Sequence, residues 1–290
     1  MAEPLPICYL NGACTPWEDA RISPFDRAFL YSDAAYEVMP VYAGRPFRFG
    51  AHCDRMTRSL AEIRMPDPHT REEWREIIGS LIKRNGGGEQ YVYWQVTRGV
   101  ERGRNHAPLP DIPRTVFAFC APFPAVAPTV LEDGAACITA IDTRWKRCDI
   151  KSTSLLANVL LRQLSVDAKA VETILLEDGE LIEASSSAVH VVVDGELRTP
   201  PHSRRILPSI TRGAIEELAE RARIPHRSVP ISESELRAAE EIWLASATRE
   251  VLPVTQLDGK PVGSGKVGPV WRRLRECFDR YKQELAGEPW

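Results

Sequence analysis

The order of apolar and polar residues in the first 120 positions predicts a mixture of strands and helices. CYLNGACT predicts a hairpin that turns at Asn11-Gly12, and YEVMPVYAGRPFRFG predicts a second hairpin that turns near Ala43-Gly44. From about residue 52 the apolar positions recur at helical spacing and stop before Pro66, and TREEWREIIGSLIKRNGGG predicts a second helix that ends at its glycines. The segments EQYVYWQVTRG and RTVFAFCAPFP are typical of strands.

The later part of the chain repeats this mixture. ACITAIDTRW predicts a strand, RCDIKSTSLLANVLLRQ a short extended stretch followed by a helix, and ETILLEDGELIEASSSAVHVVVDGELRTP three strands. Ser232 and Glu235 have the spacing of a capping box at a helix start, and EIWLASAT is typical of a strand. Helices are predicted at about 210–223, 232–240 and 266–284.

A proline-rich segment separates the two parts. Residues 121–132 contain three prolines and lack helical periodicity, so we interpret them as an interdomain linker. The prediction is therefore an α+β fold with a small N-terminal α+β domain over residues 1–120 and a larger C-terminal domain over residues 133–290. Each domain is expected to hold a mainly antiparallel sheet with helices beside it.

Composition narrows the class of protein. The net charge of −3 gives no electrostatic reason to expect nucleic acid or an anionic membrane as a partner, and no apolar run approaches the length of a membrane span. The first residues have neither a basic nor an apolar signal region, which favours a cytoplasmic protein over a secreted one. The seven cysteines and six histidines lack the spacing of disulfide frameworks or metal sites, so no metal is expected.

Lys151 lies at the predicted junction between the extended stretch and its helix. Most lysines are surface residues, but functional groups often project from the ends of rigid elements. A poorly solvated lysine loses its proton more easily, and the free amine forms Schiff bases with aldehydes such as pyridoxal 5'-phosphate (PLP). A PLP enzyme also needs an acid beside the pyridine nitrogen, a phosphate-binding site and a group that recognises the substrate carboxylate.

Candidates for these partners are present in the later part of the chain. Glu183 lies in an otherwise apolar strand, although an outward-facing strand glutamate is the simpler interpretation. The helix that begins near Ile210 and Thr211 offers free N–H groups to a phosphate, unless it is simply capped. Small hydroxyl residues end the strand in LASATRE, and Arg55 lies on a helix, where it is either a phosphate ligand or a surface charge.

Several motifs in one order resemble the fold type IV PLP-dependent aminotransferases, and within them most closely the D-amino acid aminotransferases. The resemblance spans about residues 7–283. It implies two α/β domains with mainly antiparallel sheets, the larger C-terminal one a pseudo-barrel, and a homodimer. The matching stretches are YSDAAYEVMPVYAGRPFRFGAHCDRMTRSLAEI, YVYWQVTRG, RWKRCDIKSTSLLANVL, IEASSSAVH, ILPSITRGAI and ASATREVLPVTQLDGKPVGSGKVGP.

The resemblance also implies roles for individual residues. Lys151 would form the Schiff base with PLP and then move the Cα proton, and Glu183 would pair with the pyridine nitrogen. Leu207 would pack against the ring. The phosphate would be held by Arg55, Ile210, Thr211, Ser246, Ala247 and Thr248.

A loop in the N-terminal part carries the implied substrate specificity. In D-amino acid aminotransferases an Arg-x-His pair from the neighbouring subunit, together with a tyrosine, binds the substrate α-carboxylate. Tyr36, Arg104 and His106 match that pattern. The loop is one residue longer than usual, which leaves Arg98 and Arg102 as alternatives for the carboxylate arginine.

The resemblance implies a ping-pong transfer of the amino group from a D-amino acid, such as D-alanine, to a 2-oxo acid, either 2-oxoglutarate or pyruvate. Alternatives are a fold type IV relative that acts on (R)-amines or branched-chain amino acids, and an aminodeoxychorismate lyase. The segment STSLLAN after Lys151 differs from the Gly-Gly-Asn-Tyr-like run that is usual in branched-chain aminotransferases. A protein that binds the cofactor without catalysis is the remaining alternative.

Overall fold

The computed structural model describes residues 3–287 and residue 290, and the chain packs into two compact units. The first unit runs to Pro124 and includes Ile150–Leu155 and the residues from Leu285 onwards. The second unit comprises Ala125–Asp149 and Leu156–Glu284. Lys151 therefore packs with the N-terminal unit, although the chain segments before Ile150 and after Leu155 belong to the second unit.

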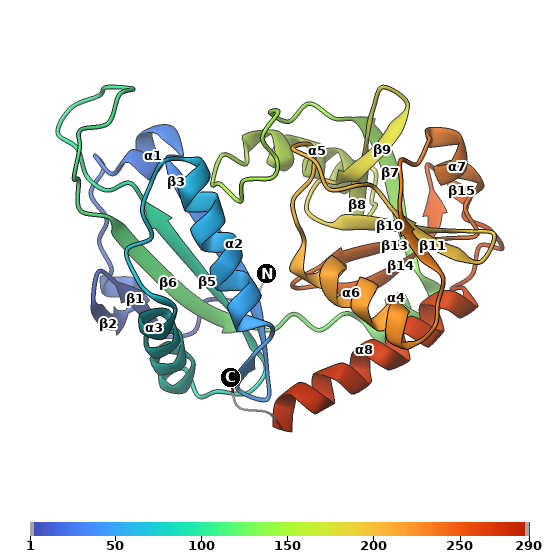
Figure 1. Ribbon diagram of the computed structural model, residues 1–290, viewed down its shortest axis with the longest axis horizontal. Helices are drawn as coiled ribbons and strands as arrows, with labels where there is room; N and C mark the ends of the chain where they lie inside the picture. The colour runs from blue at the N-terminus through green and yellow to red at the C-terminus, as the bar shows by residue number, and fades with distance from the viewer. Residues whose placement is uncertain (1–2, 288–289) are drawn as a thin grey trace. The chain divides into compact units, whose positions relative to one another are not determined.

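The first unit is a six-stranded sheet in the order β2-β1-β6-β5-β3-β4, with every neighbouring pair antiparallel. Helices α2 and α3 cover one of its faces (Figure 1), and their apolar residues form a core with the sheet around Met56, Leu60 and Trp94. Its elements are β1 (Ile7–Leu10), β2 (Ala13–Pro16), the 3-10 helix η1 (Trp17–Asp19), α1 (Arg27–Tyr31), β3 (Ala34–Tyr42), β4 (Arg45–Pro46), α2 (Phe49–Glu62), α3 (Arg71–Arg84), β5 (Gln90–Thr97) and β6 (Thr115–Pro122).

The second unit is a curled, largely antiparallel sheet in the order β12-β11-β10-β13-β14-β7-β8-β9, with β15 beside β14 (Figure 1). The pairs β7·β8, β7·β14 and β11·β12 are parallel. Its elements are α4 (Pro128–Asp133), β7 (Ala135–Ile141), α5 (Leu156–Asp167), β8 (Glu172–Glu177), β9 (Glu180–Ala184), β10 (Ala188–Val193), β11 (Glu196–Thr199), α6 (Ile210–Arg221), β12 (His226–Ser228), α7 (Glu233–Ala238), β13 (Glu241–Ser246), β14 (Glu250–Leu257), β15 (Lys260–Pro261) and α8 (Pro269–Gly287).

Local sequence signals account for many of these boundaries. The first hairpin turns at Asn11 and Gly12, which both have positive φ, as its twist requires. Ser232 and Glu235 form the predicted capping box at the start of α7. Glu241 accepts hydrogen bonds from the N–H groups of Val270 and Trp271 at 2.9 Å and so caps α8 from a neighbouring strand.

The helix expected from about residue 52 is confirmed and begins at Phe49. The predicted linker includes the short helix α4, because Pro128 occupies a first-turn position that proline tolerates, and its role as a linker stays a prediction. Two local predictions are wrong. The segment 172–199 forms four strands rather than three, since Ser185–Ser187 interrupt it. Residues 148–150 form a turn instead of an extended stretch, and α5 begins only at Leu156.

Within the described residues, no helix is long and apolar enough to cross a membrane.

Candidate active site

The backbone of Lys151 is fixed to the free edge of strand β3. Strand β4 pairs only with Val41 and Tyr42, at the far end of β3. The opposite end of that edge is taken by residues 151–153. Tyr36 N donates to Lys151 O at 2.9 Å, and Thr153 N donates to Ala34 O at 3.1 Å. The lysine is thus held by strand pairing rather than by a helix or a flexible loop.

The side chain of Lys151 lies over an aromatic ring. Its Nζ is 4.4 Å from the centre of the Tyr36 ring, within the range of a cation–π contact. Helix α2 adds a further contact, because Lys151 N donates to Ser59 Oγ at 3.3 Å. Two residues predicted for catalysis and substrate binding therefore lie side by side in the first unit.

Arg55 is bound by a carboxylate that the sequence prediction missed. Its Nε and Nη2 each donate to Glu37 at 2.7 Å, and the Nδ1 of His52 lies 2.7 Å from the same carboxylate. Burial alone would raise the pKa of Glu37, but the Arg55 guanidinium and His52 together hold it at about 2. Burial also lowers the pKa of His52. Glu37 thus fixes Arg55 on α2 beside the start of β3.

Glu183 in β9 is a buried carboxylate with two donors. Arg144 Nη1 donates to its Oε1, and Leu207 N donates to its Oε2 at 3.2 Å. Burial raises the pKa of Glu183, while Arg144 and the Leu207 N–H oppose that shift. Its burial among apolar strand residues excludes the simpler interpretation of an outward-facing strand glutamate. Arg144 also binds Asp142, so this buried cation has two acidic partners.

The start of α6 has the properties expected of an anion site. Ser209 caps the helix by accepting from Arg212 N at 3.2 Å. The N–H groups of Ile210 and Thr211 lie in the first turn, where an α-helix provides no acceptor for them. Leu207, which contacts Glu183, precedes this turn by three residues. The residues predicted to contact the ring and its nitrogen therefore lie beside the start of α6 in the second unit, whereas Arg55, also predicted to hold the phosphate, belongs to the first unit.

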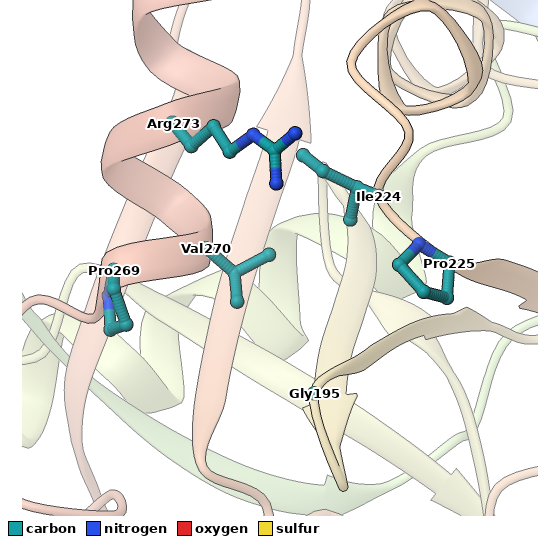
Figure 2. Close-up of a pocket in the computed structure, with 6 residues that line it drawn as sticks. All are labelled: Gly195, Ile224, Pro225, Pro269, Val270 and Arg273. Atoms are coloured by element: carbon teal, nitrogen blue, oxygen red, sulfur yellow. The ribbon is translucent and has the colours of Figure 1, made fainter.

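A pocket at the other end of α6 is lined by residues outside the predicted site (Figure 2). Ile224 and Pro225 line it beyond the helix end, together with Val270 and Arg273 of α8. None of the residues predicted to bind cofactor or substrate lines this pocket. The guanidinium of Arg273 donates to Ala222 O, so this cation caps the C-terminal end of α6.

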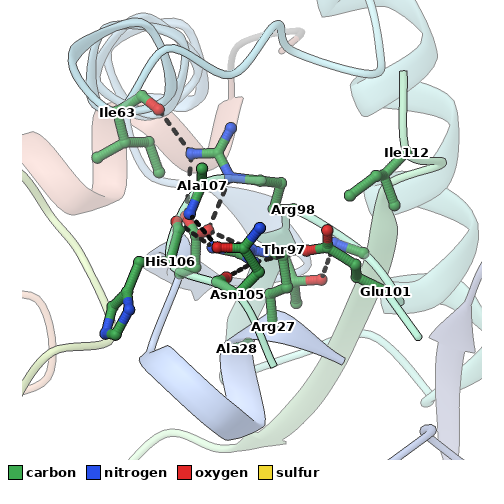
Figure 3. Close-up of polar contacts among 12 residues, drawn as sticks. Arg27, Ala28, Ile63, Thr97, Arg98, Glu101, Asn105, His106, Ala107 and Ile112 are labelled. Atoms are coloured by element: carbon green, nitrogen blue, oxygen red, sulfur yellow. Dashed lines mark hydrogen bonds and ion pairs between the residues drawn. The ribbon is translucent and has the colours of Figure 1, made fainter. Parts of the chain in front are cut away.

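Arg98 is one alternative for the arginine that binds the substrate carboxylate, but its guanidinium already makes structural contacts. Its Nε and Nη2 donate to Asp33 at 2.7 and 3.0 Å. Nη2 also donates to Ile63 O at 2.7 Å (Figure 3). Arg98 and Arg27 lower the pKa of Asp33 against the effect of burial. The next residue, Gly99, has a φ of +104°, and a Cβ there would overlap Pro113 O. Both residues shape the base of the loop.

Buried Arg27 organises the loop itself (Figure 3). Its Nη1 donates to Glu101 Oε2 at 2.6 Å and to Asn105 O at 2.7 Å, while Nη2 donates to His106 O at 3.0 Å. Arg27 also packs over the ring of Tyr31. The exposed loop therefore keeps a defined path near its Arg-x-His pair.

Arg104 and His106 meet at one aromatic ring. The Arg104 guanidinium lies 5.2 Å from the centre of the Tyr31 ring, and the His106 ring lies 5.5 Å from the same centre. Both side chains are exposed. Arg102 is also exposed in the same loop. The structure thus groups Arg104 with His106, whereas Arg98 is bound to Asp33.

The sequence prediction missed the partners that hold these groups. Glu37, Arg144, Arg27 and Tyr31 each contact a predicted site residue or its loop. All but Arg27 lie within the stretches that resemble the family, but the sequence prediction gave none of the four a role. One signal was available for Glu37, because it is the only charged residue in a predicted strand of otherwise apolar and aromatic residues. Long-range pairing identifies the others only once the fold is known.

Comparison with known proteins gives one consistent family. The sequence model described as amino-transferase class IV matches residues 34–257. The D-alanine aminotransferase of Listeria monocytogenes serotype 1/2a (strain 10403S) is 36% identical over 281 residues, covering 96% of this chain and 97% of that protein. The D-alanine aminotransferase of Staphylococcus aureus (strain MSSA476) is 37% identical, covering 94% and 96%.

A solved structure shares the whole architecture. The branched-chain amino acid aminotransferase of Escherichia coli superimposes with a TM-score of 0.90 at 25% identity, covering 100% of this chain and 98% of that one. The likeness includes both units, and it agrees with the predicted fold type.

The Glu37 cluster generates a prediction about acid stability. The folded-state pKa of about 2 lies below the usual 4.5, so the stabilisation is fully present above about pH 4.5 and is lost as the pH falls towards 2. Between pH 7 and pH 3 this group should account for a loss of about 2 kcal/mol. Urea unfolding at both pH values should show that loss in the parent protein but not in Glu37→Gln.

An exposed glutamate of α3 provides the control. Glu76→Gln should keep the acid dependence of the parent protein. Equal losses of unfolding free energy in the parent and in Glu37→Gln would contradict the proposed charge state of Glu37.

Proposed function

The chain belongs to the class IV aminotransferase family, and on that basis we propose that it is a PLP-dependent D-amino acid aminotransferase. It transfers the amino group of a D-amino acid, such as D-alanine, to 2-oxoglutarate or pyruvate in a ping-pong cycle. The two D-alanine aminotransferases at 36% and 37% identity support this specificity. The observation that carries it is the grouping of Arg104 and His106 around Tyr31.

The residues present fit the chemistry of PLP. The buried carboxylate of Glu183 suits a protonated pyridine nitrogen, and the first turn of α6 suits a phosphate. Arg55, Leu207 and the loop Ser246–Thr248 complete the proposed set. Bound PLP would supply an aldehyde for amines and a ring that withdraws electrons from the substrate Cα.

The residues of this chain then have separate tasks. Lys151 Nζ would hold the cofactor through its aldehyde between cycles, and it would take the proton from the substrate Cα. Arg144 sustains the negative charge of Glu183, because a guanidinium stays protonated at neutral pH. Tyr36 packs beside the amine and restricts the directions from which it reaches the substrate.

The carboxylate of the substrate is assigned to Arg104, with His106 beside it. An exposed guanidinium can form two parallel hydrogen bonds to a carboxylate. The contacts of Arg98 with Asp33 and Ile63 make that alternative less suitable. The branched-chain alternative is supported by structural likeness at 25% and 27% identity, while the sequence relatives at 36% and 37% identity are D-alanine aminotransferases.

We also propose a homodimer in which the loop with Arg104 and His106 reaches the site of the neighbouring copy. Helix α5 supports self-association. It exposes Leu156 by 73% and both Val159 and Leu160 by 61%, with Leu164 on the same side. Four apolar side chains at helical spacing form a stripe that water solvates poorly, and a second copy would cover it.

We also propose a domain boundary and a location in the cell. We place the domain boundary in residues 121–132, with domains over 1–120 and 133–290. A cytoplasmic location agrees with seven cysteines that are all free thiols, since a reducing compartment keeps thiols unpaired.

The assignment of Lys151 can be tested by covalent trapping. After borohydride treatment with PLP, intact-mass and peptide analysis should find the cofactor on Lys151 in the parent protein. Lys151→Ala should lose this adduct and nearly all turnover, because the only amine assigned to the aldehyde is gone. Lys146→Ala is the matched control, since that lysine is exposed and pairs with Glu177. An adduct of equal yield on Lys151→Ala would disprove the assignment.

The carboxylate role can be tested with three arginines of one loop. Arg104→Met should lower kcat/KM for D-alanine about 100-fold, as expected for a lost charge-assisted pair, with PLP affinity unchanged. Arg102→Met should stay within about twofold. Arg98→Met should instead lower the melting temperature, because the partly buried carboxylate of Asp33 loses one of its two arginine partners. Loss of activity in Arg102→Met alone would move the role to Arg102.

The dimer proposal has its own test. Light scattering should find the parent protein as a dimer, and Leu160→Asp should shift it to monomer because a charge would be buried at the contact. Ile141→Asp, at an exposed position outside α5, should remain dimeric. A parent protein that is monomeric at micromolar concentration would contradict the proposed assembly.

A further inference from the structure

A buried carboxylate holds the serine run of the second unit. Glu172, the first residue of β8, has no exposed surface. Its Oε1 accepts a hydrogen bond from Ser185 Oγ, and its Oε2 accepts from Ser186 Oγ at 2.7 Å and from Ser187 Oγ at 3.1 Å. Three consecutive hydroxyls thus converge on one side chain. This contact explains why the chain breaks between β9 and β10 at these serines.

Arg249 joins the same carboxylate from a different loop. Its Nη1 donates to Glu172 Oε2 and to Ser187 Oγ, the latter at 3.0 Å. Its Nη2 lies 3.4 Å from Val171 O. The Arg249 side chain is 22% exposed and that of Glu172 is fully buried. A buried carboxylate that lost this cation would be left uncompensated, so the pair constrains both loops strongly.

The cluster connects two segments of the proposed cofactor site. Ser185 follows Glu183 by two residues, at the end of β9. Arg249 directly follows the loop Ser246–Thr248, at the end of β13. Strands β10 and β13 are paired at Ala188 and Ala245, so the serine turn and this loop lie at the same end of neighbouring strands. Glu172 bridges them from β8.

We propose that Arg249, anchored on Glu172, is a positioning residue that holds Ser246–Thr248 in the conformation that binds the PLP phosphate. This inference rests on the proposed function of the same site. Ser246 ends β13 and pairs with Glu250, whereas Ala247 and Thr248 lie in the turn between the two strands, where the Arg249 side chain links the turn to the buried cluster. A loop that binds phosphate through backbone N–H and hydroxyl groups needs such an anchor, because small displacements weaken several hydrogen bonds together.

A purely structural role would give a different result. If the ion pair only stabilised the sheet, its loss would lower the melting temperature and weaken every ligand of the site equally. A positioning role concerns the phosphate alone. Comparing PLP with pyridoxal, which lacks the phosphate, separates the two.

The experiment measures the Kd of PLP and of pyridoxal for the full-length apo-protein by fluorescence titration, and the melting temperature without ligand. Arg249→Met should raise the Kd of PLP about tenfold, the effect of one weakened charge-assisted hydrogen bond, and that of pyridoxal by less than about twofold. Arg249→Lys should fall between it and the parent protein. Glu172→Gln should also raise the Kd of PLP. If Arg249→Met does not fold, the result for Glu172→Gln tests the inference in its place.

Arg227→Met is the matched control, because Arg227 pairs with Glu196 elsewhere in the same unit. It should leave both Kd values unchanged. An unaltered ratio of the two Kd values in Arg249→Met, or in Glu172→Gln where Arg249→Met does not fold, would overturn the inference. If the parent protein binds PLP no more tightly than pyridoxal, the proposed cofactor site itself fails, which is a separate result.

Discussion

The free edge at the start of β3 is the constraint on which the proposed active site depends. A strand edge with unpaired N–H and C=O groups must find partners, and here residues 151–153 supply them although they follow a segment of the other unit. That pairing fixes the backbone of Lys151 to a rigid sheet. The reactive amine can then reach out over Tyr36 with only its own side-chain torsions to order, which favours a reproducible position for proton transfer.

Buried carboxylates form the second level of organisation. Glu37, Glu183 and Glu172 each lie inside a unit, and each pairs with an arginine. Such pairs contribute little net stability, because desolvation offsets their attraction. Their common feature is location, since each adjoins a residue proposed to contact the cofactor. We interpret them as fixing the orientation of these groups, with Glu183 also serving as the proposed partner of the pyridine nitrogen.

Local patterns predicted most of the elements, and long-range polar pairing explains what they missed. The hairpin at Asn11-Gly12 and the capping box of α7 depend on neighbouring residues, and both are confirmed. The serine break after β9 involves Glu172, which precedes Ser185 by 13 residues and lies in another strand, so no hairpin or capping pattern reveals it. The residues of the proposed site also separate into those that sequence patterns indicated and those that only long-range contacts reveal. Family motifs indicated Lys151 and Glu183, whose roles stay predictions, whereas Arg144 binds Glu183 across a long stretch of chain and was not predicted.

Transfer of an amino group from the D enantiomer is tested most directly by one assay. The purified protein with PLP would be offered D-alanine, L-leucine or (R)-phenylethylamine as the only donor and 2-oxoglutarate as acceptor, with chiral analysis of the glutamate formed. We expect rapid turnover of D-alanine with formation of D-glutamate, and at least about 100-fold slower use of the other donors. Turnover of L-leucine with formation of L-glutamate, in the absence of D-alanine turnover, would contradict the proposed specificity.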